Sequence, residues 1–122
     1  MDSALKEVLD RVALTAAWLD IEPKRLTDRN SMGDTPLHTV CTWGDVRAVK
    51  VLLKEGADVN ASGESGSPPL INAIAGGSYE VVEVLVRHGA DLGVVNEIGY
   101  TPLRYAMAVN ADGRIKSILS KK

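Results

Sequence analysis

The sequence is poor in several residue types, and each shortage excludes something. The chain of 122 residues has no Phe, and aromatic residues make up 4% of it. Hydrophobic residues make up an ordinary 45%, enough for a core. The shortage of aromatic residues favours a thin stack of helices packed through Ala, Val, Ile and Leu over one large core. The single cysteine, Cys41, excludes an internal disulfide and is typical of a reducing compartment.

Charge and long apolar runs are also scarce. The net charge is −2 and no basic stripe is visible, so a nucleic-acid partner is not expected. No stretch approaches the roughly 18 apolar residues that span a bilayer. Residues 1–7 have neither a basic start nor an apolar run, so no secretory signal is predicted. We therefore expect a cytoplasmic protein without nucleic-acid or membrane partners.

What the chain does have is an internal repeat. The hexapeptide Gly33–His38 (GDTPLH) returns as Gly66–Ile71 (GSPPLI) and Gly99–Arg104 (GYTPLR), each time after 33 residues. A second marker, Gly-Ala-Asp, begins at Gly56 and again at Gly89, at the same interval. Two independent markers at one interval identify a repeat protein.

This period and these motifs resemble the ankyrin repeat family. The match is clear over residues 31–122 and degenerate before them. The resemblance implies an all-α solenoid of stacked helix-turn-helix units with short β-hairpin fingers. It divides one domain, 1–122, into an N-terminal cap repeat (1–30), two repeats (31–65 and 66–98) and a C-terminal cap repeat (99–122). Both ends are expected to be adapted to water.

The motif residues have local roles that physical chemistry explains. Thr35 and Thr101 are suited to cap a first helix, with a proline following at the first helical position. The first of these helices is predicted over 36–42, and a second, amphipathic helix follows residues 44–45. In the middle repeat Pro68 replaces the capping Thr, and Gly76-Gly77 supplies an extra glycine. We expect these changes to make the middle of the stack its softest part.

The first thirty residues are predicted to be a decayed repeat. One helix face is formed by apolar residues at spacings of three and four: Leu5, Val8, Leu9 and Val12. Stepping back 33 positions from the second helix of the next repeat gives further apolar residues, which suggest a second helix: Ala13, Ala16, Leu19 and Leu26. Trp18 is expected to be buried between the cap helices.

No arrangement typical of catalysis is present. There is no phosphate-binding glycine loop, no Cys or His pair at metal-ligand spacing, and no nucleophile with a base. We therefore predict no enzymatic activity, no cofactor and no metal. His38 is expected to form a hydrogen bond within its turn. Cys41 is interpreted as a packed core thiol, with a reactive thiol as the alternative. The basic residues at 114, 116, 121 and 122 are predicted to lie near a helix C-terminus, where positive charge favours capping and solubility. The alternative interpretation of these four residues is a patch that binds nucleic acid.

In proteins that this chain resembles, partners dock on the finger tips and on the exposed side of the first helices. Mapping those positions gives the predicted partner-binding residues: Met32, Asp34, Thr42, Trp43, Glu64, Ser65, Ser67, Glu97, Ile98, Tyr100 and Val109. Ser31, Ala75, Gly76 and Ala108 occupy equivalent positions.

Trp43 is the leading candidate because Trp, Tyr and Arg dominate interface hot spots. The alternative is that its indole covers the cap or the hairpin. Tyr105 has two interpretations, a contact or a core residue. Asp34, Glu64 and Glu97 place one acid on each finger, which suggests a basic or donor-rich partner; a solvated acidic edge is the alternative.

The sequence therefore predicts a protein–protein interaction module that acts as an adaptor, regulator or inhibitor. Two alternatives stay open. One is a self-associating structural subunit, and the other is a bacterial immunity or antitoxin-like inhibitor of a toxin enzyme.

Overall fold

The computed structural model describes residues 3–15, 18, 23 and 25–120. Within them the chain forms seven α-helices and one short 3-10 turn, η2, and no β-strand. Their bounds are α1 Ser3–Ala13, α2 Pro36–Trp43, α3 Val46–Lys54, η2 Glu64–Gly66, α4 Pro69–Gly76, α5 Tyr79–Arg87, α6 Pro102–Ala108 and α7 Gly113–Leu119. No helix of this part of the chain is long and apolar enough to cross a bilayer.

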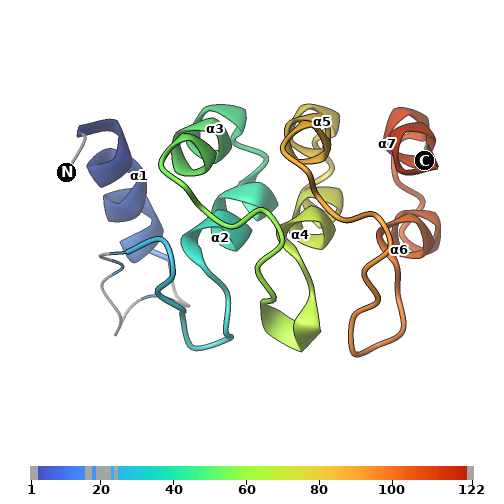
Figure 1. Ribbon diagram of the computed structural model, residues 1–122, viewed down its shortest axis with the longest axis horizontal. Helices are drawn as coiled ribbons and strands as arrows, with labels where there is room; N and C mark the ends of the chain where they lie inside the picture. The colour runs from blue at the N-terminus through green and yellow to red at the C-terminus, as the bar shows by residue number, and fades with distance from the viewer. Residues whose placement is uncertain (1–2, 16–17, 19–22, 24, 121–122) are drawn as a thin grey trace.

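The helices lie in two parallel rows, and the loops between repeats extend from one side as fingers (Figure 1). One row contains the first helices of the repeats, α2, α4 and α6, and the other contains the second helices, α3, α5 and α7. Each first helix packs against its own second helix and against the first helix of the next repeat. The two chain ends lie at opposite ends of the stack.

Helices α3 and α6 begin at side-chain caps: the sequence predicts Thr101 as a cap and Asp45 only as part of a turn. Asp45 caps α3 by accepting a 3.0 Å hydrogen bond from the Ala48 amide, and Thr101 caps α6 through the Arg104 amide at 3.2 Å. Pro68 precedes α4 without a side-chain cap, as expected from the loss of threonine. Helix α2 ends one residue beyond the predicted 36–42, where Gly44 adopts a left-handed conformation with φ 70°.

The core repeats with the same period as the sequence. Leu37 and Leu70 are equivalent and both buried, and so are Val49, Val82 and Ile115. Cys41 belongs to this core and is fully buried. Burial raises the pKa of its thiol, so the structure favours the packed core thiol over the reactive one.

The N-terminal helix is confirmed as α1, whose buried face contains Val8, Leu9 and Val12. Trp18 is 1% exposed, and its indole Nε1 donates a 3.0 Å hydrogen bond to Oγ1 of Thr39 in α2. The predicted burial of Trp18 is therefore confirmed. The predicted second helix of this unit lies mostly outside the described residues, which leave out Ala16 and Leu19; Ala13 belongs to α1.

The fingers are loops and not the expected β-hairpins. At the base of each finger a backbone amide donates to a carbonyl oxygen four residues later: Asn30 to Asp34 (2.9 Å) in the first finger, Gly63 to Ser67 (2.8 Å) in the second or middle finger, and Asn96 to Tyr100 (3.0 Å) in the third. The other backbone bonds within the fingers are turn bonds, such as that from the Gly33 amide to the Asn30 carbonyl oxygen (3.0 Å). No strand forms in the described residues. A β-ladder needs further bonds beyond the closing pair, and in the middle finger η2 takes its place, with Ser65 at a positive φ of 56°.

Gly76 contributes to the packing of the middle repeat, and the softness expected of that repeat stays a prediction. It is the last residue of α4, and a β-carbon on it would lie 2.5 Å from the Thr42 carbonyl oxygen of α2. The absence of a side chain therefore permits close packing of α4 against α2. The second glycine, Gly77, adopts the left-handed conformation that ends α4, with φ 73°.

The C-terminal repeat is adapted to water only in part. Arg104 and Ser117 replace the buried Ile71 and Val84 of the preceding repeat, as a cap requires. Met107, however, is 63% exposed, whereas the equivalent Ile74 is 2% exposed. Met107 therefore leaves an apolar surface on the last described repeat.

Candidate functional site

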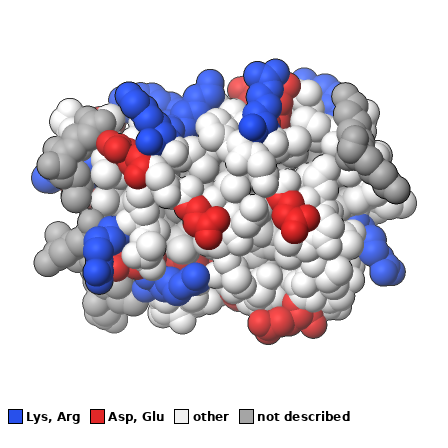
Figure 2. Space-filling view, viewed as in Figure 1, with Lys and Arg blue, Asp and Glu red and all other residues white. Residues whose placement is uncertain are grey.

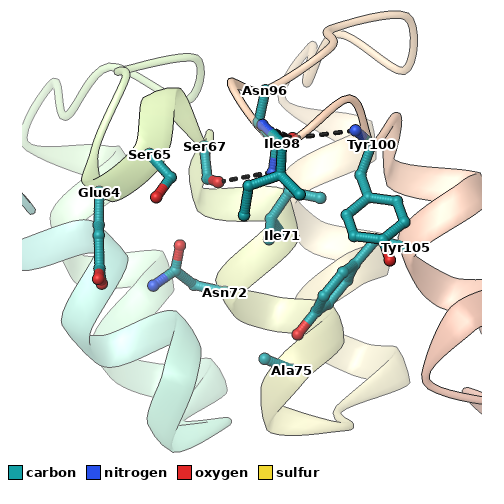
Figure 3. A pocket seen from close by; sticks show the side chains of 10 residues that line it. All are labelled: Glu64, Ser65, Ser67, Ile71, Asn72, Ala75, Asn96, Ile98, Tyr100 and Tyr105. Carbon is teal, nitrogen blue, oxygen red and sulfur yellow. Dashed lines mark hydrogen bonds between the residues drawn. The ribbon is translucent and has the colours of Figure 1, made fainter.

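A shallow cavity of about 280 Å³ lies between the second and third fingers and the first helices below them (Figure 3). We call it the inter-finger groove. Its walls come from η2, α4, the third finger and α6. The lining residues are Glu64, Ser65, Ser67, Ile71, Asn72, Ala75, Asn96, Ile98, Tyr100 and Tyr105.

One wall of the groove is aromatic and apolar. The rings of Tyr100 and Tyr105 meet edge to face, with centroids 5.8 Å apart and an interplanar angle of 66°. Tyr100 comes from the finger and Tyr105 from α6, so the pair joins the loop to the helix. Ile98 stands beside them on the finger and is 68% exposed. An exposed apolar side chain next to two aromatic rings is typical of a binding surface.

The floor of the groove is a helix surface with an oriented amide. Asn72 of α4 donates from Nδ2 to Oγ1 of Thr42 at 3.0 Å. The Thr42 hydroxyl in turn donates to the His38 carbonyl oxygen at 3.2 Å. This chain of hydrogen bonds holds the Asn72 carboxamide, whose Oδ1 is then available as an acceptor. Ala75, one turn further along α4, is small and exposed.

The third finger is positioned by Asn96, which is 7% exposed. Its Oδ1 accepts hydrogen bonds from the amides of Ile98 (3.1 Å) and Tyr100 (3.0 Å), and its Nδ2 donates to Oγ of Ser67 (3.1 Å). The Glu97 amide also donates to the Ser65 carbonyl oxygen at 2.9 Å. These bonds fix the aromatic wall relative to the middle finger.

The first finger is also held by an asparagine side chain that accepts hydrogen bonds from two backbone amides of the finger. Oδ1 of Asn30 accepts from the amides of Met32 (2.9 Å) and Asp34 (3.0 Å). The middle finger has Gly63 at this position, because a β-carbon there would lie 2.6 Å from Nε2 of His38. Its support comes instead from Asp34, whose Oδ1 accepts from the Glu64 amide at 2.8 Å.

His38 forms the hydrogen bond predicted within its turn. It is fully buried; Nδ1 accepts from the Thr35 amide at 3.1 Å, and Nε2 lies 3.0 Å from the Ser67 carbonyl oxygen. These partners require a neutral ring that carries its proton on Nε2. Desolvation by burial lowers the pKa of His38, although the carboxylate of Asp34 opposes this shift.

Two predicted contact residues are engaged inside the protein; Asp34, which does not line the groove, is a correction to the predicted contact set, whereas Ser67 still belongs to the groove lining. Both are buried, at 9% and 8% exposure, and both are used internally: Asp34 holds the Glu64 amide, and Ser67 binds Asn96 and His38. The expectation of one solvent-facing acid on each finger fails at the first finger. Glu64 and Glu97 are exposed.

The structure brings five predicted residues to the groove: Glu64, Ser65, Ser67, Ile98 and Tyr100. Met32, Thr42, Trp43, Glu97 and Val109 are exposed but do not line it. The sequence does not indicate that Ile71, Asn72 and Asn96 line the groove, and it leaves two interpretations open for Tyr105, which the structure places in the lining. The recurrence of Asn30 at Asn96, two repeats later, was the available signal for the finger support.

Trp43 lies against the N-terminal helix and not in the groove. The guanidinium of Arg11 in α1 is 5.1 Å from the centroid of its ring, and 37% of Trp43 stays exposed. The indole therefore covers part of the cap while presenting its remaining surface to solvent.

Charge is distributed unevenly over the molecule. Figure 2 shows Lys and Arg side chains together with acidic ones along the upper edge, where the second helices lie in Figure 1, and an acidic patch at the lower edge, where η2 lies. The only groups of the groove lining that ionise are Glu64 and the two tyrosines. No group of three or more His, Cys, Asp or Glu in the described part of the chain is placed to hold a metal ion.

Stacked helix pairs with a groove beneath their fingers define a repeat-protein scaffold. A comparison with known protein families matches residues 9–96 to three copies of the ankyrin repeat. The chain belongs to the ankyrin repeat family, whose repeats generally mediate protein–protein interaction. A search of the curated proteins finds no match to the chain.

Proposed function

We propose that the protein is a non-enzymatic, cytoplasmic module that binds a protein partner through the inter-finger groove and acts as an adaptor, regulator or inhibitor. The observation that carries this proposal is the wall formed by the half-buried rings of Tyr100 and Tyr105 and the exposed side chain of Ile98. Burying such a wall against a partner would gain affinity because aromatic and apolar anchors dominate interface energies.

The flanking predicted residues extend the contact beyond the groove. Met32, Trp43, Glu97 and Val109 are exposed, and we propose that they form its rim. Rim residues contribute less than the centre of an interface but exclude water from it.

The test uses two alanines at equivalent helix positions. Ala75 lines the groove, whereas Ala108, 33 residues later, does not, and both are exposed. Ala75→Arg fills the groove with a long side chain, and Ala108→Arg makes the same charge change outside it. Wild type and both variants are used to capture proteins from a lysate of the source organism, with mass spectrometry as the readout.

A protein retained by wild type and Ala108→Arg but lost by Ala75→Arg supports the groove as the binding surface. Equal retention by all three forms would place the interaction elsewhere. Circular dichroism of both variants checks that the helices remain folded.

Self-association is the second candidate, and the exposure of Met107 favours it. Met107 is 63% exposed, whereas its equivalent Ile74 in the preceding repeat is 2% exposed. A second copy that packed against Met107 would bury it. Sedimentation equilibrium would then show a concentration-dependent mass that Met107→Asp abolishes; a monomer at all concentrations would exclude this candidate.

A further inference from the structure

We propose that the inter-finger groove binds an arginine side chain presented by an extended segment of the partner. This inference rests on the proposed function and names the chemistry of the group that the groove accepts. It stands on three features of the lining: an acid without a partner, an aromatic wall, and an amide acceptor on the floor.

The acid is Glu64. Among the described residues, its carboxylate has no hydrogen-bond or ion-pair partner; its backbone amide donates to Asp34, and its backbone carbonyl accepts from the Ser67 amide. No Lys or Arg lines the groove. An unpaired carboxylate at one side of a shallow cavity favours a cation there, because a charge-assisted hydrogen bond is roughly twice as strong as a neutral one.

The aromatic wall is the second feature. Figure 3 shows Tyr100 and Tyr105 on the side of the groove opposite Glu64. The faces of aromatic rings attract cations, and arginine is the most frequent cation in such pairs. The same protein already uses this contact twice, with Arg11 over Trp43 at 5.1 Å and Arg114 over Tyr79 at 4.7 Å.

The third feature is Asn72, which Figure 3 places on the floor between Glu64 and the tyrosines. Its Nδ2 is committed to Thr42, so its free Oδ1 is an acceptor. A guanidinium carries five N–H donors in a plane, which lets one group reach a carboxylate and an amide oxygen while its flat face stacks on a ring. An ammonium group offers no such plane, so the arrangement favours arginine over lysine.

The size of the groove agrees with one side chain. Sites for whole small molecules occupy about 300–1,000 Å³, whereas this cavity measures about 280 Å³ and is open to solvent. Because the site is open, salt will screen the interaction with Glu64.

The experiment begins with a random peptide library displayed on phage and selected on the intact protein. Peptides whose binding is lost with Ala75→Arg and kept with Ala108→Arg are groove ligands. We expect arginine at one position of every such peptide. A synthetic peptide is then compared with its citrulline version, which keeps the shape of arginine and removes the charge. Citrulline should weaken binding by about tenfold or more.

Two matched variants assign the effect to the acid. Glu64→Gln should reduce the preference for arginine over citrulline and leave only the part that the aromatic wall provides. Glu97→Gln, the same change at the equivalent position of the next finger, should keep the whole preference, because Glu97 does not line the groove. The preference should also decrease as salt is raised.

The outcomes separate this inference from the proposed function. Groove ligands that lack a basic residue, or an equal affinity for arginine and citrulline, would overturn the arginine site and leave the groove as a protein-binding surface. Lysine in place of arginine would overturn the preference for the planar group. If no selected peptide depended on Ala75, the groove itself would be contradicted.

Discussion

The guanidinium of Arg11 lies 5.1 Å from the ring centroid of Trp43, and its Nη1 lies 2.9 Å from Oδ2 of Asp45. Asp45 caps α3, so one arginine of α1 contacts both the end of α2 and the start of α3. The hydrogen bond from the Ala48 amide and the pairing with Arg11 lower the pKa of Asp45. The cap helix is thus tied to the first complete repeat by a contact between charge and aromatic ring.

This arrangement predicts energetic coupling between Arg11 and Trp43. In a double-mutant cycle with Arg11→Ala and Trp43→Ala, we expect a coupling free energy of about 0.5–1 kcal/mol, the usual value for an exposed cation–π pair. Urea unfolding of the four forms measures it. Additive effects would show that the contact contributes nothing to stability and would leave Trp43 with a role in binding alone.

Because His38 is buried, we expect the protein to lose stability in mild acid. Burial lowers its pKa below the ordinary value of 6.5, so between the two values the unfolded chain binds more protons than the folded chain. The stability that the buried neutral His38 contributes is complete above about pH 6.5 and decreases as the pH falls towards the lowered pKa. Denaturant unfolding from pH 7.5 to 5 should show the decrease.

The variant His38→Gln tests this assignment. It should lose that part of the pH dependence and also about 2 kcal/mol of stability, because the Thr35 amide and the Ser67 carbonyl lose their partner. The control His88→Gln leaves His38 in place and should keep the decrease. An unchanged pH profile in His38→Gln would contradict the role of this residue.

Gly76 predicts an unusual response to alanine. Replacing glycine inside a helix normally stabilises it by up to about 1 kcal/mol. At Gly76 the added carbon would meet the Thr42 carbonyl oxygen at 2.5 Å, so we expect Gly76→Ala to lower the free energy of unfolding by about 1–3 kcal/mol. Gly113, the first residue of α7, has nothing within 4 Å, and Gly113→Ala should be neutral or stabilising. Equal effects at both sites in thermal unfolding would contradict the close approach of α2 and α4.

Asn96 predicts a link between finger geometry and binding. Asn96→Ala removes both acceptor bonds to the Ile98 and Tyr100 amides and the bond to Ser67. We expect a loss of about 2 kcal/mol in stability and weaker binding of groove-selected peptides, because Tyr100 is no longer positioned. The neighbouring exposed change Glu97→Ala should stay within about 0.5 kcal/mol in stability. Peptide affinity that survives Asn96→Ala would show that the aromatic wall does not need this support.

The sequence by itself determined the family, the positions of the repeats and most of the helix ends. The 33-residue spacing, the capping residues and the apolar period are local properties, so Thr101, Asp45 and Gly44 could be understood without a structure. The interpretations of His38, Cys41 and Trp18 also agree with the structure, because each position has a defined place within the repeat.

Only the tertiary structure decided which of the residues expected to be exposed are available to a partner. Asp34 and Glu64 are both acids on fingers, but Asp34 is buried by the next finger and Glu64 is not. From the sequence alone, Gly76 is expected to loosen its repeat, whereas the structure shows that it lies close to the Thr42 carbonyl oxygen of α2. Tyr100 and Tyr105 form one wall because the third finger lies over α6. The physical reason is that these roles depend on contacts between segments about thirty residues apart or between a loop and the helix it covers, and spacing along the chain does not specify such contacts.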